Sequence, residues 1–282
     1  MNLENYEKYL KDNNKAKTTI EAYVYDTKGF IKYCRNNQIQ PLTVDANIMD
    51  NYLQYLKTNN ITNKTMARKL ISIRNYYTYL FKMGIMRHIP TFNSIKSTHS
   101  KNITYISRKD YNKMIRSIDI NDFLGTRNKT VIMMLYETGL KTSELLNITL
   151  DNIDLNDNCI YYKEPMRRLS ISGDLKSAIS RYLRFRQDIQ TLCDNLFINH
   201  RGRKLSRQSI FRIVKDASND LHITYKIDNN SFRDTYILNH FIQGKKPFKL
   251  FYLLNYTDAK HLSLFHDYYE NNHELLNKLN QA

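Results

Sequence analysis

Residues that end helices are scarce in this chain, since its 282 residues include only seven glycines and four prolines. Long helices are therefore favoured, because these two residues are the commonest helix breakers. Apolar residues recur at helical spacing in four stretches of the N-terminal region, at residues 3–10, 20–34, 48–56 and 66–80. Residues suited to N-cap positions stand near three of these stretches: Thr18, Asp45 and Thr62. We therefore predict four N-terminal helices.

A polar stretch at residues 88–104 interrupts this periodicity and contains Pro90. Such composition is typical of a linker between domains. It divides the chain into a helical domain at residues 1–87 and a second domain at residues 105–282.

The second domain mixes helices with short strands. Residues 127–138 are apolar on nearly all sides and predict a buried helix that ends at Gly139. Residues 159–162 and 168–171 predict two strands around a turn at residues 163–165, and the pattern is helical again from Leu175 onward. The expected fold is mainly α, with a small β-hairpin or sheet in the second of two domains.

The net charge of the chain indicates which classes of partner are favoured. Lys and Arg number 43 against 27 Asp and Glu, a net charge of +16. A surface this positive favours a polyanion, with nucleic acid first and anionic membrane second, although a generally basic protein is the simpler alternative. We see neither a signal peptide nor an apolar stretch long enough to span a membrane, and expect a cytoplasmic, DNA-associated protein. The three cysteines are scattered, so we expect no metal and no cofactor.

Three segments resemble the tyrosine recombinases, the family of phage integrases and Xer proteins. Residues 127–155, RNKTVIMMLYETGLKTSELLNITLDNIDL, carry TGL, SELL and a trailing Ile-Asp in the family's order. Residues 195–215 and 230–269 are similar to two later segments, and the four-helix region looks like the family's core-binding, SAM-like domain. The resemblance covers nearly the whole chain and implies a two-domain architecture, with a helical core-binding domain and a mixed α/β catalytic-like domain.

The resemblance also implies a chemistry. In this family a tyrosine hydroxyl attacks a phosphodiester, while two arginines and a histidine stabilise the developing charge and a hairpin lysine protonates the leaving oxygen. Here most of those positions are substituted. Lys141 stands at the first arginine, Asn230 at a histidine, Tyr256 at a later histidine and Phe265 at the nucleophile. Only the second arginine is retained, as Arg233.

For two family positions, the hairpin lysine and the nucleophile, more than one residue of this chain is a candidate. Counting along the hairpin puts Pro165 at the lysine position, and Lys163, two residues upstream, is a candidate substitute. Phenylalanine cannot attack phosphorus, so Phe265 indicates lost chemistry. Tyr268 and Tyr269 follow closely and are fallback nucleophiles, although a shift of about 5 Å along a helix exceeds what catalysis tolerates. The alternative is that both are ordinary aromatic residues.

Basic and polar residues predict contacts with DNA in both domains. The candidates in the first domain are Lys17, Thr18, Thr65, Arg68, Lys69 and Ser72. The densest cluster lies in the second domain and includes Arg201, Arg203, Lys204, Arg207 and Gln208. A solvated polar face is the alternative interpretation of each group. For Arg233 the alternatives are phosphate binding and pairing with an acid such as Asp234.

We therefore expect a duplex-DNA-binding protein of the recombinase fold that is catalytically degenerate and acts in recombination, integration or maintenance of a mobile element. Its partners would be double-stranded DNA and, on DNA, a second copy or an active recombinase. The alternatives are an active divergent recombinase using Tyr268 or Tyr269, a type IB topoisomerase, and a basic protein with no role on DNA. The C-terminal tail is expected either to dock on a neighbouring subunit or to pack on its own domain.

Overall fold

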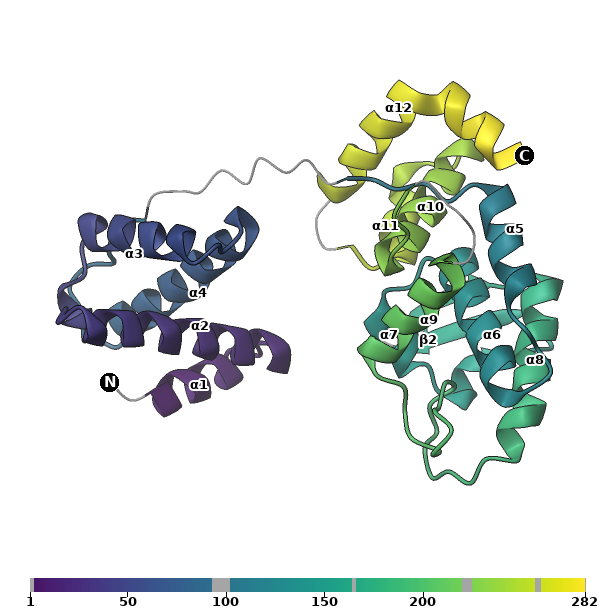
Figure 1. Cartoon of the computed structure of the whole chain (residues 1–282), viewed down its shortest axis with the longest axis horizontal. Helices are drawn as coiled ribbons and strands as arrows, with labels where there is room; N and C mark the ends of the chain where they lie inside the picture. Colours follow the sequence, from purple (N-terminus) through teal and green to yellow (C-terminus); the bar gives the residue numbers. More distant parts are fainter. Residues whose placement is uncertain (1–2, 93–101, 164–165, 220–224, 257–259, 282) are drawn as a thin grey trace. The chain divides into compact units, whose positions relative to one another are not determined.

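The computed structural model describes residues 3–92, 102–163, 166–219, 225–256 and 260–281 (Figure 1). The chain divides into two compact units, residues 1–100 and 101–282. Each unit has a hydrophobic core of its own. Residues 93–101 of the predicted linker lie outside the described residues.

The first unit contains the four predicted helices, α1 (Leu3–Asp12), α2 (Lys17–Asn36), α3 (Ala46–Thr58) and α4 (Asn63–Lys82), with a 3-10 turn, η1 (Pro41–Thr43), before α3. Asp45 and Thr62 are N-caps, since their side chains accept the backbone N–H of Ile48 and Thr65. Thr18 is not a cap, because α2 begins one residue earlier with Ala16 at the cap position.

Aromatic rings fill much of the first core. Tyr6, Tyr76 and Tyr77 are almost fully buried, and Phe30 packs edge to face against Tyr52 with ring centroids 4.9 Å apart. The Tyr77 hydroxyl donates a hydrogen bond to the Pro41 carbonyl at 2.7 Å, which satisfies its polar end inside the core. Tyr77 therefore joins α4 to the turn before α3.

A buried carboxylate ties α2 to α4. Asp26 is fully buried and accepts hydrogen bonds from both Nη atoms of Arg68, from Lys69 Nζ at 3.1 Å and from Ser72 Oγ at 2.8 Å. A buried charge is tolerated only when it is paired in this way. The predicted DNA contact at Ser72 is not consistent with this burial, because the hydroxyl points to Asp26 inside the unit. The side chain of Lys69 is only 13% exposed, whereas that of Arg68 is 47% exposed.

The second unit surrounds a small antiparallel sheet of order β1-β2-β3, formed by β1 (Ile153–Asp154), β2 (Cys159–Lys163) and β3 (Met166–Ser170). In the β2–β3 hairpin, Cys159 pairs with Ser170 and Lys163 with Met166. The helices before the sheet are α5 (Arg108–Ser117), α6 (Phe123–Thr138) and α7 (Thr142–Asn147), followed by η2 (Leu150–Asn152). The helices after it are α8 (Gly173–Gln187), α9 (Arg207–Asn219), α10 (Asn229–Ile242), α11 (Pro247–Leu253) and α12 (Lys260–Gln281).

This architecture confirms the predicted fold class, which is mainly α with a small sheet. Helix α6 is buried on nearly all sides, as its sequence predicted, and ends at Gly139 in the left-handed conformation. No helix among the described residues is both long and apolar enough to span a membrane.

The C-terminal helix packs on its own unit in this structure. Helix α12 lies against α10 and α5 (Figure 1), and Leu276 near its end is only 1% exposed. The Tyr105 hydroxyl donates to Asn280 Oδ1 at 3.3 Å. Of the two arrangements expected for the tail, the structure therefore has the intramolecular one.

The Asp26 cluster generates a stability prediction. Replacing Asp26 by Ala leaves Lys69 without its carboxylate partner, so we expect the free energy of unfolding to fall by about 2 kcal/mol. Urea denaturation of the full chain, followed by a probe in the first unit, measures the change. Glu21→Ala, at an exposed acid on the same helix, is the matched control and should stay within about 0.5 kcal/mol of the parent. Equal stability of the two variants would contradict the structural role of Asp26.

Candidate functional site

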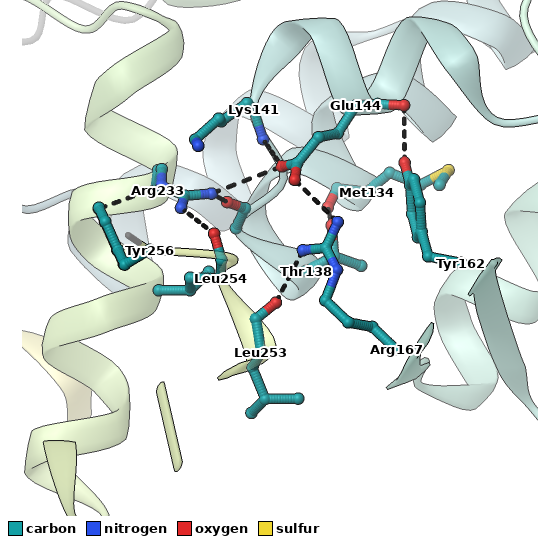
Figure 2. Close-up of polar contacts among 11 residues, drawn as sticks. Met134, Thr138, Lys141, Glu144, Tyr162, Arg167, Arg233, Leu253, Leu254 and Tyr256 are labelled. Carbon is teal, nitrogen blue, oxygen red and sulfur yellow. Dashed lines mark hydrogen bonds and ion pairs between the residues drawn. The ribbon is translucent and has the colours of Figure 1, made fainter. Parts of the chain in front are cut away.

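Arg233 on α10 is the centre of a cluster of polar contacts shown in Figure 2. The residue is 7% exposed, and its Nη1 and Nη2 donate to the carbonyl oxygens of Gly139 at 2.7 Å and Leu254 at 2.6 Å. Its Nε donates to the Tyr256 hydroxyl at 3.2 Å, and the guanidinium lies over the Tyr256 ring at 4.7 Å. These bonds fix the orientation of the planar guanidinium without using all of its donors.

The turn between α6 and α7 is shaped to meet this arginine. Gly139 has a φ of +59°, and its N–H closes α6 on the Leu135 carbonyl at 3.1 Å, so its own carbonyl is turned toward Arg233. A Cβ at this position would lie 2.5 Å from the Tyr236 ring. Only glycine therefore suits both the backbone conformation and the space.

Glu144 on α7 joins the turn to two arginines. Its Oε2 accepts the backbone N–H of Lys141 at 2.8 Å and lies 3.7 Å from Arg233 Nη1. Its Oε1 accepts from Nη2 of Arg167, a residue of β3, at 2.8 Å. The carboxylate is 13% exposed, so both cations act on it in a largely dry environment. Figure 2 shows its contacts with both arginines.

Arg167 was not among the predicted site residues, and neither was Glu144. Arg167 Nη1 donates to the Leu253 carbonyl at 2.9 Å, and its guanidinium lies over the Tyr162 ring at 4.7 Å. One signal could have found it: side chains alternate along β3, and Arg167 shares the buried face with Leu169 while Arg168 is exposed.

Lys141 brings a third positive charge. Its Nζ lies 5.9 Å from the centroid of the Tyr256 ring. Burial lowers the pKa of Lys141, and the neighbouring Arg233 lowers the pKa further. With three cations and one carboxylate, the cluster of Lys141, Glu144, Arg167 and Arg233 has a formal net charge of +2. Such a cluster suits an anion that presents two oxygens to a planar guanidinium, such as the non-bridging oxygens of a phosphodiester.

The other predicted active-site positions lie in different surroundings. Asn230 is exposed in the first turn of α10, and Phe265 is 1% exposed within the apolar cluster of α10, α11 and α12. Tyr268 and Tyr269 are half-buried against the same cluster. Lys163 ends β2, but its side chain and Pro165 lie outside the described residues. The structure thus brings Lys141, Arg233 and Tyr256 together.

The predicted basic cluster of the second unit is exposed and partly adjoins this site. Lys204 Nζ donates to Asn147 Oδ1 at the end of α7, at 2.6 Å. Arg207 and Gln208 open α9 and line a cavity of about 480 Å³ with Lys141 and Asn229. Arg201 and Arg203 lie on the preceding loop, where Asn199 Oδ1 accepts both of their backbone N–H groups. Among the described residues that line this cavity, Lys141 comes from the Arg233 cluster and Arg207 from the predicted basic cluster.

In the first unit, Lys17 and Thr18 are exposed at the start of α2. Thr65 is half-buried, and its hydroxyl accepts a hydrogen bond from the Thr62 hydroxyl at 3.0 Å. Among the described residues, no group of three His, Cys, Asp or Glu side chains is placed to hold a metal ion.

Two family models match the chain. The model of the phage integrase family covers residues 104–271. The model of the phage integrase N-terminal SAM-like domain covers residues 3–84.

Curated relatives share about a quarter of their residues with this chain. A putative tyrosine recombinase of Caldanaerobacter subterraneus is 26% identical over 247 residues, which cover 86% of this chain and 84% of the relative. Tyrosine recombinase XerC of Anoxybacillus flavithermus is also 26% identical over 247 residues, covering 84% of this chain and 82% of the relative.

Solved structures with a similar fold include complexes with DNA. The XerH site-specific recombinase bound to its difH substrate has a TM-score of 0.72 and 17% identity, covering 94% of this chain and 80% of that one. The Tn1549 transposon integrase in complex with a circular intermediate DNA has a TM-score of 0.74 and 16% identity, covering 92% of both chains. At these identities the likeness shows a shared fold.

The turn at Gly139 makes the site sensitive to a single methyl group. We expect Gly139→Ala to lower the free energy of unfolding by about 2–4 kcal/mol, from the left-handed backbone and the overlap with Tyr236. Chemical denaturation measures this loss. Gly29→Ala is the control, because Gly29 lies in α2 with nothing within 4 Å of an added Cβ, and it should raise stability by roughly 0.5–1 kcal/mol. A neutral Gly139→Ala would show that the turn tolerates a different backbone.

Proposed function

Because the chain belongs to the phage integrase family of tyrosine recombinases, we propose that it binds duplex DNA and holds a backbone phosphate at Arg233 without cleaving the strand. The observation that carries this proposal is the buried guanidinium of Arg233 within a cluster of net positive charge. A fixed guanidinium in a dry site binds a phosphodiester more strongly than an exposed one does.

The relatives support DNA as the partner. XerH and the Tn1549 integrase are described in complex with DNA, and a lambda integrase dimer of similar fold is bound to a core site. The net charge of +16 and the exposed Arg201, Arg203, Lys204 and Arg207 provide a surface for further phosphates. Lys17, Thr18 and Arg68 are the corresponding candidates of the first unit, and Gln208 is a candidate for contact with a base edge.

The proposed loss of cleavage rests on the position of Phe265. A phenylalanine has no hydroxyl with which to attack phosphorus, and its ring is buried in an apolar cluster. The substitutions at Lys141 and Asn230 act in the same direction, because each changes a group that would stabilise the transition state. Removing one such group typically lowers the rate by about 10²–10³-fold.

We further propose that such a DNA-bound protein acts in recombination, integration or maintenance of a mobile element, in the cytoplasm and together with a second copy or an active recombinase. The alternative is an active enzyme that uses another tyrosine. Tyr268 and Tyr269 follow Phe265 on α12, and Tyr256 has its hydroxyl 3.2 Å from Arg233 Nε.

A gel assay with duplexes from the neighbouring genome, including nicked substrates that trap covalent intermediates, tests the proposal. We expect a shift in native gels and no protein–DNA band that survives SDS. Arg233→Met should weaken duplex binding about tenfold or more, the effect of losing one hydrogen bond to a charged group. Arg184→Met removes the same charge at an exposed position of α8 and should have a small effect.

Other results have defined meanings. An adduct stable in SDS would overturn the proposed loss of cleavage, and Tyr→Phe variants at residues 256, 268 and 269 would identify the nucleophile. Absence of a shift at low salt would overturn DNA binding itself. If Arg233→Met and Arg184→Met weaken binding equally, Arg233 does not hold a phosphate, and the chain attracts DNA only through its general positive charge.

A further inference from the structure

Glu144 has more cations around it than one carboxylate can neutralise. Its Oε1 is held by Arg167 Nη2 at 2.8 Å, which is a strong charge-assisted hydrogen bond. Its Oε2 accepts the Lys141 N–H at 2.8 Å and lies 3.7 Å from Arg233 Nη1, beyond hydrogen-bond distance. The carboxylate is therefore bonded to Arg167, while Arg233 is left with a longer contact.

The same geometry shows what Glu144 would do without Arg167. A carboxylate that is only 13% exposed requires a partner, since water cannot replace the lost cation fully. Arg233 is the nearest remaining guanidinium, and a small rotation of the carboxylate would close the 3.7 Å gap. Arg233 would then form an ion pair and a hydrogen bond with Glu144, and that charge and N–H donor would no longer be available to a phosphate.

We propose that Arg167 is a positioning residue of the Arg233 site: it occupies Glu144 and so keeps the charge and donors of Arg233 for a phosphate. This inference rests on the proposed function, because it assumes that a phosphate is bound at Arg233. In this proposal Arg167 acts through Glu144, since its two Nη atoms donate to Glu144 Oε1 and to the Leu253 carbonyl.

A second contact of Arg167 positions another group that bonds to Arg233, the backbone at the end of α11. Its Nη1 donates to the Leu253 carbonyl at 2.9 Å, and the next carbonyl along the chain, that of Leu254, accepts from Arg233 at 2.6 Å (Figure 2). Arg167 thus links β3 to the end of α11, where two successive carbonyls hold the two arginines. The Arg167 guanidinium therefore bonds to two groups beside Arg233: the Glu144 carboxylate and the Leu253 carbonyl.

Packing alone does not account for an arginine at this position. Arg167 Nε is buried without a hydrogen-bond partner, which costs free energy that a long apolar side chain would avoid. The adjacent Arg168 shows the ordinary arrangement, because it is exposed and lies 3.8 Å from Asp157. The buried arginine is explained by the carboxylate that it neutralises.

A suppressor experiment separates this role from others. We expect Arg167→Met to weaken binding of a duplex oligonucleotide about tenfold at fixed salt, and Glu144→Gln added to Arg167→Met to restore binding to within about threefold of Glu144→Gln alone. Glutamine can still accept the Lys141 N–H but cannot draw away the charge of Arg233. Restoration excludes an arginine that contacts DNA directly, and unchanged thermal unfolding of Arg167→Met excludes the destabilisation that an unpaired Glu144 would cause.

Two further variants complete the design. Arg168→Met removes the same charge from the outer face of β3, and whatever its effect, Glu144→Gln should not suppress it. Arg167→Lys keeps the charge and should bind DNA better than Arg167→Met. Thermal unfolding of each variant shows whether the fold is retained, and Arg167→Lys serves as the test if the methionine variant does not fold.

The outcomes distinguish this inference from the proposed function. If Arg233→Met weakens binding but Arg167→Met does not, or if Glu144→Gln fails to restore the double variant, the positioning role is wrong while phosphate binding at Arg233 stands. If Arg233→Met itself has no effect, the proposed function fails first.

Discussion

The contacts of Arg233 join several separate parts of the second unit at one point. A buried guanidinium must have acceptors on several sides, and here they come from three places in the chain: the turn after α6, the end of α11 and Tyr256 beyond it. Glu144 and Arg167 extend the same network to α7 and to β3. The relative positions of these elements are therefore coupled, because moving any one of them would leave a buried donor or acceptor unsatisfied.

Each of the two units contains a largely buried carboxylate that lies beside two cations. Asp26 on α2 pairs with Arg68 and Lys69 of α4. Glu144 on α7 pairs with Arg167 of β3 and lies near Arg233 of α10. A buried ion pair is weak evidence of net stabilisation, because desolvation of the two charges offsets much of their attraction. A few cations are therefore paired with carboxylates inside the units. The exposed cations favour the approach of a polyanion.

Phe265 and Tyr256 are two aromatic residues of the second unit with different surroundings. Phe265 fills the apolar cluster in which Leu262 and Leu276 are also buried, so its position is used for packing. Tyr256, by contrast, combines a ring that lies under Arg233 with a hydroxyl that accepts from it. The proposed phosphate site depends on charge and geometry, whereas the resemblance places the nucleophile at Phe265, which has no hydroxyl.

Local patterns in the sequence determined the helices, the small hairpin, the end of α6 at Gly139 and the family, because periodicity, capping and short motifs are properties of neighbouring residues. They also identified Lys141, Arg233 and Tyr256, through the order of the motifs. Only the tertiary structure decided that Arg167 joins the site, that Ser72 faces Asp26 and that the tail packs on its own unit. These depend on which elements meet in space, since a charged side chain becomes a surface cation or a buried partner according to the carboxylate that packing brings beside it.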